Sequence, residues 1–222
     1  MQEFLATVPV PGSATFFCTH RYESLTEPHE ICPHPVLDEE RDWATELSAK
    51  RAEFPDAIGW RSHSCIYSHL IAERVAASGY LYASTQYQPL APARPFREPW
   101  GIWHMPVYYM DNMDFSRPRF WPDAGQVPFS SEVIDTALAD DGVYVFDFHP
   151  IHLLLNSTSA DAYFERRDAF LRGERLETLR CEGRGARTFY DELCAKMERR
   201  GTLSVRMKDA LAPAVGAAAP EG

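Results

Sequence analysis

Six polar side chains of this sequence stand directly after short apolar runs, at the positions where buried strands would end. They are His34, Arg61, His63, Asp111, His149 and His152. Imidazole and carboxylate groups can each bind a metal ion or transfer a proton. Because only 8 of the 222 residues are histidine, four of them at such positions indicate a site. The chemistry that suits these residue types is hydrolysis with proton transfer.

The elements that must position these side chains alternate between β-prone runs and helical stretches. Strands are predicted at 14–18, 29–32, 58–60, 80–82, 102–109 and 143–148. Helices are predicted at 4–8, 38–54, 66–78, 132–138, 160–172 and 188–200, and a proline-rich loop at 88–100. This alternation predicts an α/β fold with a parallel sheet, in which ligands bind at the carboxyl ends of the strands. We therefore expect His34 and His149 to converge at one end of the fold.

Length and composition restrict the class of protein. A chain of 222 residues with 45% apolar and 13% aromatic side chains can bury a substantial core. We expect a single domain over residues 1–205 and a disordered, low-complexity tail over 206–222. The formal charge of −10 argues against a nonspecific nucleic-acid or anionic-membrane partner, because phosphate groups would be repelled. The partner expected instead is a small molecule or oligosaccharide, and a homo-oligomer stays open.

The lack of recognisable targeting signals and the cysteine usage favour a cytoplasmic location. No apolar run approaches the length of a bilayer span, and residues 1–11 lack the basic and apolar regions of a secretory signal. The five cysteines form an odd set without a CxxC pair, which is typical of buried, reduced thiols. We therefore expect a cytoplasmic protein.

Several motifs occur in an order that is more specific than any one of them. They read ATFF (14–17), HEICPHP (29–35), WRSHS (60–64), MPV (105–107, with Asp111 beyond it) and FDFHPIH (146–152). Together they resemble the polysaccharide deacetylase family (carbohydrate esterase family 4), and more closely its subgroup of sugar-locus deacetylases. The resemblance covers about residues 1–200.

This resemblance implies a distorted (β/α) barrel, complete or lacking a strand, and a metal-assisted hydrolytic deacetylation. The bond cleaved would be the C–N amide bond of an N-acetylated sugar or a related small metabolite. In the family a divalent ion, usually zinc, polarises the amide carbonyl and holds the attacking water, an aspartate is the general base and a histidine the general acid. Such an ion lowers the pKa of its water towards about 7.

The residue roles follow from the same resemblance. His149, Asp111 and Arg61 are the expected catalytic residues, and His63 and His152 the expected substrate-binding residues. His34 is the expected metal ligand, together with Asp38. The partner histidine usual in the family is absent after His34, and a nearby carboxylate (Asp38, Glu39 or Glu40) would take its place.

A departure from the family pattern keeps other functions open. The family's first motif, an aspartate-rich strand, would precede the helix predicted at 4–8, so we expect either a misassigned start or a genuine loss. A genuine loss would fit a catalytically degenerate ligand-binding protein. A further alternative is a metal-independent hydrolase or cyclase that uses His149 and Asp111 as an acid/base pair. Each of these residues also has a purely structural interpretation. His34 would lie in a proline-rich turn, Arg61 would form a structural ion pair, and Asp111 would stabilise a turn.

Overall fold

Short strands alternate with helices along most of the chain in this computed structural model, which describes residues 1–36, 42–92, 94–116 and 127–217. The strands are β1 (Thr15–Cys18), β2 (Glu30–Pro33), β3 (Gly59–Trp60), β4 (Tyr82–Ala83), β5 (Phe96–Arg97), β6 (Trp103–His104), β7 (Val107–Met110) and β8 (Val145–Asp147). The helices are α1 (Gln2–Thr7), α2 (Trp43–Glu53), the 3-10 turn η1 (His63–Cys65), α3 (His69–Ala77), α4 (Asp111–Phe115), α6 (Ser131–Ala139), α7 (Pro150–Leu155), α8 (Ala160–Leu171), α9 (Leu176–Leu179), α10 (Ala186–Arg199) and α11 (Met207–Ala217). The α/β class predicted from the sequence is confirmed.

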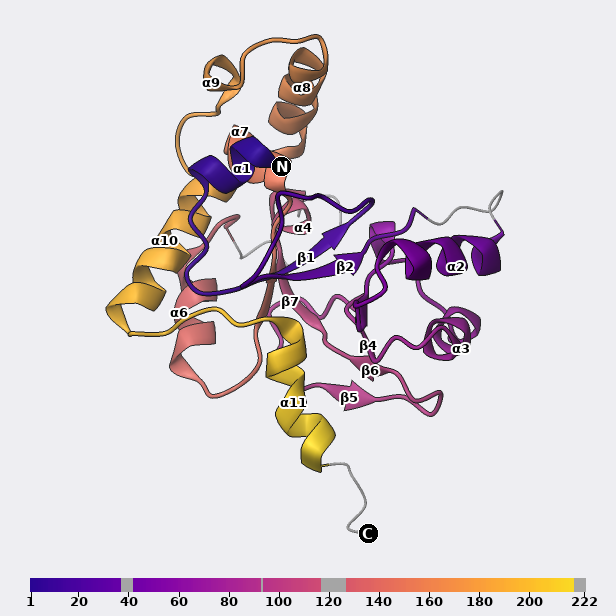
Figure 1. Cartoon of the computed structure of the whole chain (residues 1–222). Helices are drawn as coiled ribbons and strands as arrows, with labels where there is room; N and C mark the ends of the chain where they lie inside the picture. The colour runs from indigo at the N-terminus through magenta and orange to yellow at the C-terminus, as the bar shows by residue number, and fades with distance from the viewer. Residues whose placement is uncertain (37–41, 93, 117–126, 218–222) are drawn as a thin grey trace. The chain divides into compact units, whose positions relative to one another are not determined.

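One compact unit consists of residues 12–107 and 204–222. Its strands pair in parallel as β1–β2, β3–β4 and β4–β6, and β5 joins β6 as an antiparallel edge strand. Helices α2 and α3 lie side by side (Figure 1). The sequence starts these two helices at Asp42 and Ser68, whose side chains accept hydrogen bonds from backbone N–H groups of the first turn.

The other compact unit consists of residues 1–11 and 108–203 and contains the sheet β7–β8. Aromatic side chains from β7 and from the residue that follows β8 pack on α10. Tyr109 stacks on Phe189 at 4.6 Å between ring centroids, and Phe146 and Phe148 lie 5.6 Å from the Tyr109 ring. Because such rings bury a large apolar area, this cluster fixes the ends of β7 and β8, which carry the candidate site.

The strands of the described residues form three separate sheets, of two, four and two strands. No closed barrel is detected among them, so the predicted (β/α) barrel stays a prediction. The same is true of the single domain expected over residues 1–205, because the chain divides into two compact units.

The region predicted as a disordered tail contains a helix. Residues 207–217 form α11, where Leu211 is only 1% exposed. At the start of this helix the backbone N–H of Met207 donates to Thr15 Oγ1, and that of Lys208 donates to Glu30 Oε2. The low-complexity composition suggested disorder, but tertiary contacts with β1 and β2 stabilise the helix. Residues 218–222 of that prediction lie outside the described residues.

Two smaller differences from the prediction have local causes. The proline-rich loop contains the edge strand β5, which pairs with β6 on one side only. The strand predicted at 102–109 is divided into β6 and β7 by Met105 and Pro106, because proline has no N–H for a sheet hydrogen bond.

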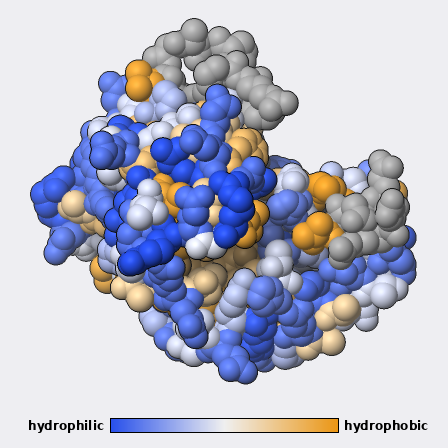
Figure 2. All heavy atoms as spheres, turned by 90° about the horizontal axis from the view of Figure 1, so that it is seen from above, coloured by the Kyte–Doolittle hydropathy of each residue, from blue (hydrophilic) through white to orange (hydrophobic). Residues whose placement is uncertain are grey.

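The surface has the polar character of a chain in which 24% of residues are charged. On the face shown in Figure 2, hydrophobic residues are scattered among hydrophilic ones. Within the described ranges, no helix combines the length and the hydrophobicity that a bilayer crossing requires.

Candidate active site

Asp111 is the buried centre of a carboxylate–imidazole group. It directly follows β7 and begins α4, and its side chain is fully buried. Its Oδ1 accepts a hydrogen bond from the backbone N–H of Asn112 at 2.6 Å. A carboxylate at the start of a helix also interacts favourably with the helix dipole. Local structure therefore holds Asp111 in one orientation.

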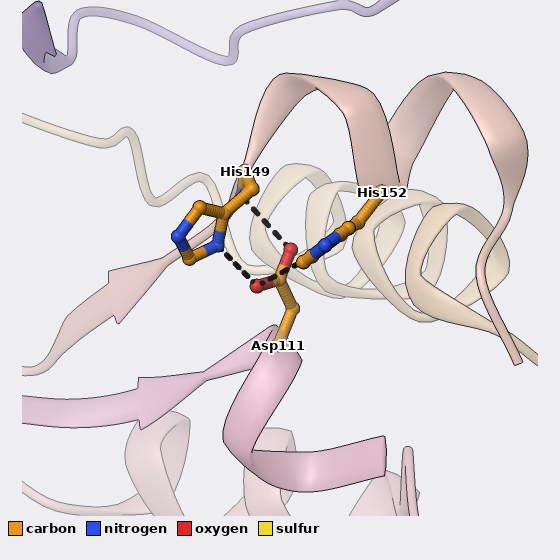
Figure 3. Close-up of side chains that lie close together, drawn as sticks. All are labelled: Asp111, His149 and His152. Atoms are coloured by element: carbon orange, nitrogen blue, oxygen red, sulfur yellow. Dashed lines mark hydrogen bonds and ion pairs between the residues drawn. The ribbon is translucent and has the colours of Figure 1, made fainter. Parts of the chain in front are cut away.

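His149 and His152 contact this carboxylate from the start of α7 (Figure 3). His149 Nδ1 lies 2.7 Å from Asp111 Oδ1, and the backbone N–H of His149 donates to Oδ2 at 2.8 Å. His152 Nδ1 lies 3.1 Å from Oδ1, within ion-pair distance but without hydrogen-bond geometry. Three residues along a helix bring side chains to the same face, which explains why both imidazoles reach one carboxylate.

Burial and charge act in opposite directions on Asp111. Desolvation alone would raise the pKa of its carboxyl group. The charges of the His152 and His149 imidazoles, together with the hydrogen bond from His149, outweigh this effect and hold the pKa of Asp111 well below its ordinary value of 3.8. Asp111 is therefore ionised at neutral pH, although it is fully buried.

The two histidines differ in their access to solvent. The His149 side chain is 40% exposed, whereas that of His152 is 5% exposed. The His152 ring meets Phe115 at 5.0 Å and Tyr163 at 4.5 Å, both edge to face. His149 can therefore reach a substrate, while the burial of His152 favours an orienting role over the substrate contact predicted for it.

Residues at the two ends of helix α7 fix its position. Pro150 occupies the first helical position, where its fixed φ suits the helix and its missing N–H is not needed. Asn156 ends the helix with a left-handed φ of 48°. Its side chain donates to the carbonyls of Cys181 and Gly183 and accepts from the backbone N–H groups of Arg187 and Thr188. These bonds tie the end of α7 to the start of α10.

A second group, in the other unit, contains His34, Arg61 and His63. His34 Nδ1 lies 3.1 Å from the backbone carbonyl oxygen of Arg61, and His34 Nε2 lies 3.3 Å from His63 Nδ1. His63 is exposed and His34 is half-buried. The polar side chains that follow β2 and β3 thus lie together, and the roles predicted for them stay predictions.

The Arg61 guanidinium is buried in the same unit. Its Nε donates to the backbone carbonyl of Ser84 at 2.6 Å, its Nη2 donates to Ser84 Oγ at 2.7 Å, and the guanidinium lies 4.3 Å from the centroid of the Phe17 ring. With 4% of Arg61 exposed, these contacts favour a positioning role over direct contact with a substrate.

Both groups offer atoms that could bind a metal ion. Asp111, His149 and His152 provide three ligand atoms within 4.8 Å of one another. However, the 2.7 Å between His149 Nδ1 and Asp111 Oδ1 is a hydrogen-bond distance. Donors bound to one tetrahedral Zn²⁺ at about 2.0–2.1 Å are about 3.3 Å apart. This group therefore fits an acid/base pair better than a zinc site.

Comparison with protein families gives a match over residues 4–167 to the family described as WbmS-like polysaccharide deacetylase. The chain belongs to this family. The WbmS-like match covers all the predicted site residues, and the family resemblance inferred from the five motifs is confirmed. Membership supports polysaccharide deacetylation in general terms.

A solved structure gives a second comparison. The WbmS-like chain is similar to a protein of Bordetella bronchiseptica described as a candidate polysaccharide deacetylase involved in O-antigen biosynthesis. The TM-score is 0.69, the sequence identity 21%, and the match covers 88% of this chain and 82% of that one. At this identity the likeness shows a shared fold. No curated protein matches the chain.

Not every predicted site residue can be assigned to a group. Asp38, the predicted second metal ligand, lies outside the described residues. His34 and His149 belong to different units, so their convergence stays a prediction. Sequence reasoning missed Phe115 and Tyr163, which enclose His152, and Asn156, which anchors α7. Only Asn156 left a signal, because asparagine readily adopts the left-handed conformation that ends a helix.

Proposed function

We propose that this chain is a hydrolase that removes the acetyl group from an N-acetylated sugar or a related small metabolite. The observation that carries the proposal is the buried Asp111 carboxyl group hydrogen-bonded to the partly exposed His149. A carboxylate in this arrangement fixes the ring orientation and stabilises the protonated imidazole. Membership in a deacetylase family supports the choice of reaction.

In the proposed reaction, water adds to the amide carbonyl, the C–N bond breaks, and acetate and an amine are released. The leaving nitrogen must gain a proton, because an amide anion is a poor leaving group. With Nδ1 hydrogen-bonded to Asp111, Nε2 of His149 is the ring nitrogen that would take a proton from the attacking water and give it to the leaving nitrogen. The Asp111 carboxylate would remain ionised and stabilise the imidazolium form.

Other residues are proposed to contribute within each unit. His152 would orient the Asp111 carboxylate in one unit, and Arg61 would position His34 through its backbone carbonyl in the other. His34 would hold the divalent ion expected for the family, because an imidazole is a good zinc ligand; Asp38 is the predicted second ligand. When bound, such an ion would polarise the carbonyl and acidify water. Substrate contact by His63 and a cytoplasmic location stay predictions.

The test is acetate release from a panel of N-acetylated sugars, measured with and without chelator. Replacing His149 by glutamine removes the proton donor while keeping a polar side chain, so turnover should fall by about 10²–10⁴-fold. His20→Gln is the control, because His20 is exposed and belongs to neither group.

Each alternative function has its own outcome in this experiment. Equal acetate release by wild type and His149→Gln would contradict the proposed role of His149. Binding of acetylated sugars without any turnover would favour a degenerate binding protein. Full activity in chelator would favour the metal-independent hydrolase.

A further inference from the structure

The chain segments that follow β2 and β3 run side by side and fix two histidines relative to each other. The backbone N–H of Arg61 donates to the carbonyl of Pro33 at 3.3 Å, and that of His63 donates to the carbonyl of Pro35 at 2.8 Å. These two bonds bracket His34. Both imidazoles therefore project from backbone whose relative position is set before any ligand binds.

The ring of His34 has a defined tautomer. Its Nδ1 lies 3.1 Å from the Arg61 carbonyl oxygen, which can only accept a hydrogen bond, so Nδ1 carries the proton. In the neutral ring Nε2 then carries the lone pair. A backbone carbonyl that fixes the ring in this way is the usual second contact of a metal-binding histidine.

The distance between the two rings fits a shared ion. His34 Nε2 and His63 Nδ1 are 3.3 Å apart, at the long end of hydrogen-bond distances. It equals the separation of about 3.3 Å expected for two nitrogens bound to one tetrahedral Zn²⁺. The rings are nearly perpendicular, with 83° between their planes.

The turn after His63 is strained. Ser64 and Cys65 both adopt left-handed backbone conformations, with φ of 56° and 53°. Such conformations are unfavourable for residues other than glycine and persist where the surrounding structure enforces them. Here the Ser62 hydroxyl donates to the carbonyl of Ile66 and closes the turn that directs His63.

We propose that His34 and His63 together bind a transition-metal ion such as Zn²⁺, and that His63 is a metal ligand and not the substrate-binding residue predicted from the sequence. Two imidazoles select a borderline ion over Mg²⁺ or Ca²⁺, which prefer oxygen ligands. Two imidazoles would leave further coordination positions of such an ion for water, substrate or another side chain. The role of the ion in catalysis rests on the proposed function. Its binding does not, because binding is measured without turnover.

The experiment is isothermal titration calorimetry, in which Zn²⁺ is added to chelator-treated, full-length protein. Mg²⁺ is the contrasting ion. Wild type is expected to bind one equivalent of Zn²⁺ at the pair, and Mg²⁺ in tenfold excess should not displace it. His63→Gln and His34→Gln should each weaken Zn²⁺ binding about tenfold or more. The control is His69→Gln, an exposed histidine of the same unit, which should bind Zn²⁺ as wild type does.

The outcomes separate this inference from the proposed hydrolase. His149→Gln should lose acetate release and keep Zn²⁺ binding. The inference is overturned if wild type binds no Zn²⁺, or if His63→Gln, with an unchanged circular dichroism spectrum, binds it as tightly as wild type. Loss of Zn²⁺ binding in His149→Gln alone would assign the ion to the Asp111 group instead.

Discussion

Asp111 carries a charge in a place where water cannot solvate it. The carboxylate is stabilised there by Asn112, by two contacts with His149 and by the nearby His152 ring. Removing one partner of such a buried group leaves another partner uncompensated, which is costlier than the loss of a surface ion pair. Asp111 therefore links the stability of this unit to the proposed chemistry.

Asp111→Asn tests this link. The amide keeps the size of the side chain but removes the charge that stabilises the His149 imidazolium. We expect kcat for acetate release to fall about 10²–10⁴-fold with little change in KM, because the charge acts on the proton transfer and not on binding. Steady-state kinetics on the best substrate of the panel measure this. A rise in KM with unchanged kcat would instead indicate a binding role.

At the scale of elements, α7 decides where both imidazoles of the Asp111 group lie. Its start is set by Pro150, and its end is tied to α10 through Asn156. The approach of the two helices depends on Gly185, where an added Cβ would lie 2.6 Å from the backbone oxygen of Asn156 and 2.9 Å from that of Ser157. Backbone atoms cannot move aside as a flexible side chain can.

Gly185→Ala should therefore push the ends of α7 and α10 apart. We expect a loss of about 1–3 kcal/mol in the free energy of unfolding, measured by chemical denaturation, together with reduced acetate release. Gly216→Ala is the matched control, because an added Cβ meets nothing within 4 Å there. Equal stability of Gly185→Ala and wild type would show that α7 is not fixed by this contact.

At the scale of the whole molecule, the free energy of unfolding should decrease at acidic pH. The pKa of Asp111 is held below its ordinary value, for the reasons given above. Burial opposes the shift at Glu192, but hydrogen bonds with Ser131, Lys196 and Arg184 lower its pKa to about 2. A carboxyl group with a depressed folded-state pKa stabilises the fold above its unfolded-state pKa, and this contribution is lost as pH falls through the folded-state pKa.

The melting temperature should therefore fall progressively as the pH is lowered from about 4.5 to 2, because both carboxyl groups lose their contribution in this range. Calorimetric scans across this range measure the effect. Glu192→Gln should melt lower than wild type at pH 7 and show a smaller fall in acid. A melting temperature that rises on acidification would contradict the assigned shifts.

The α/β class, most strands and helices, and the family could be predicted from the amino-acid sequence alone. These features follow from local patterns, such as the β-prone run before His149 and the capping residues Asp42 and Ser68. It also indicated which strand ends carry polar side chains, because parallel strands direct their carboxyl ends to one side. The family was predicted from the order of the motifs, since no single motif was specific.

Which of those side chains contact one another could not be predicted from the sequence. Distances between residues 38 positions apart, such as Asp111 and His149, depend on packing that no local pattern encodes. The burial of Arg61 and the ordering of α11 also arise from long-range contacts. The sequence therefore supplied the donors and acceptors, while the packing of distant segments set their separation, and separation determines whether two groups share a proton or an ion.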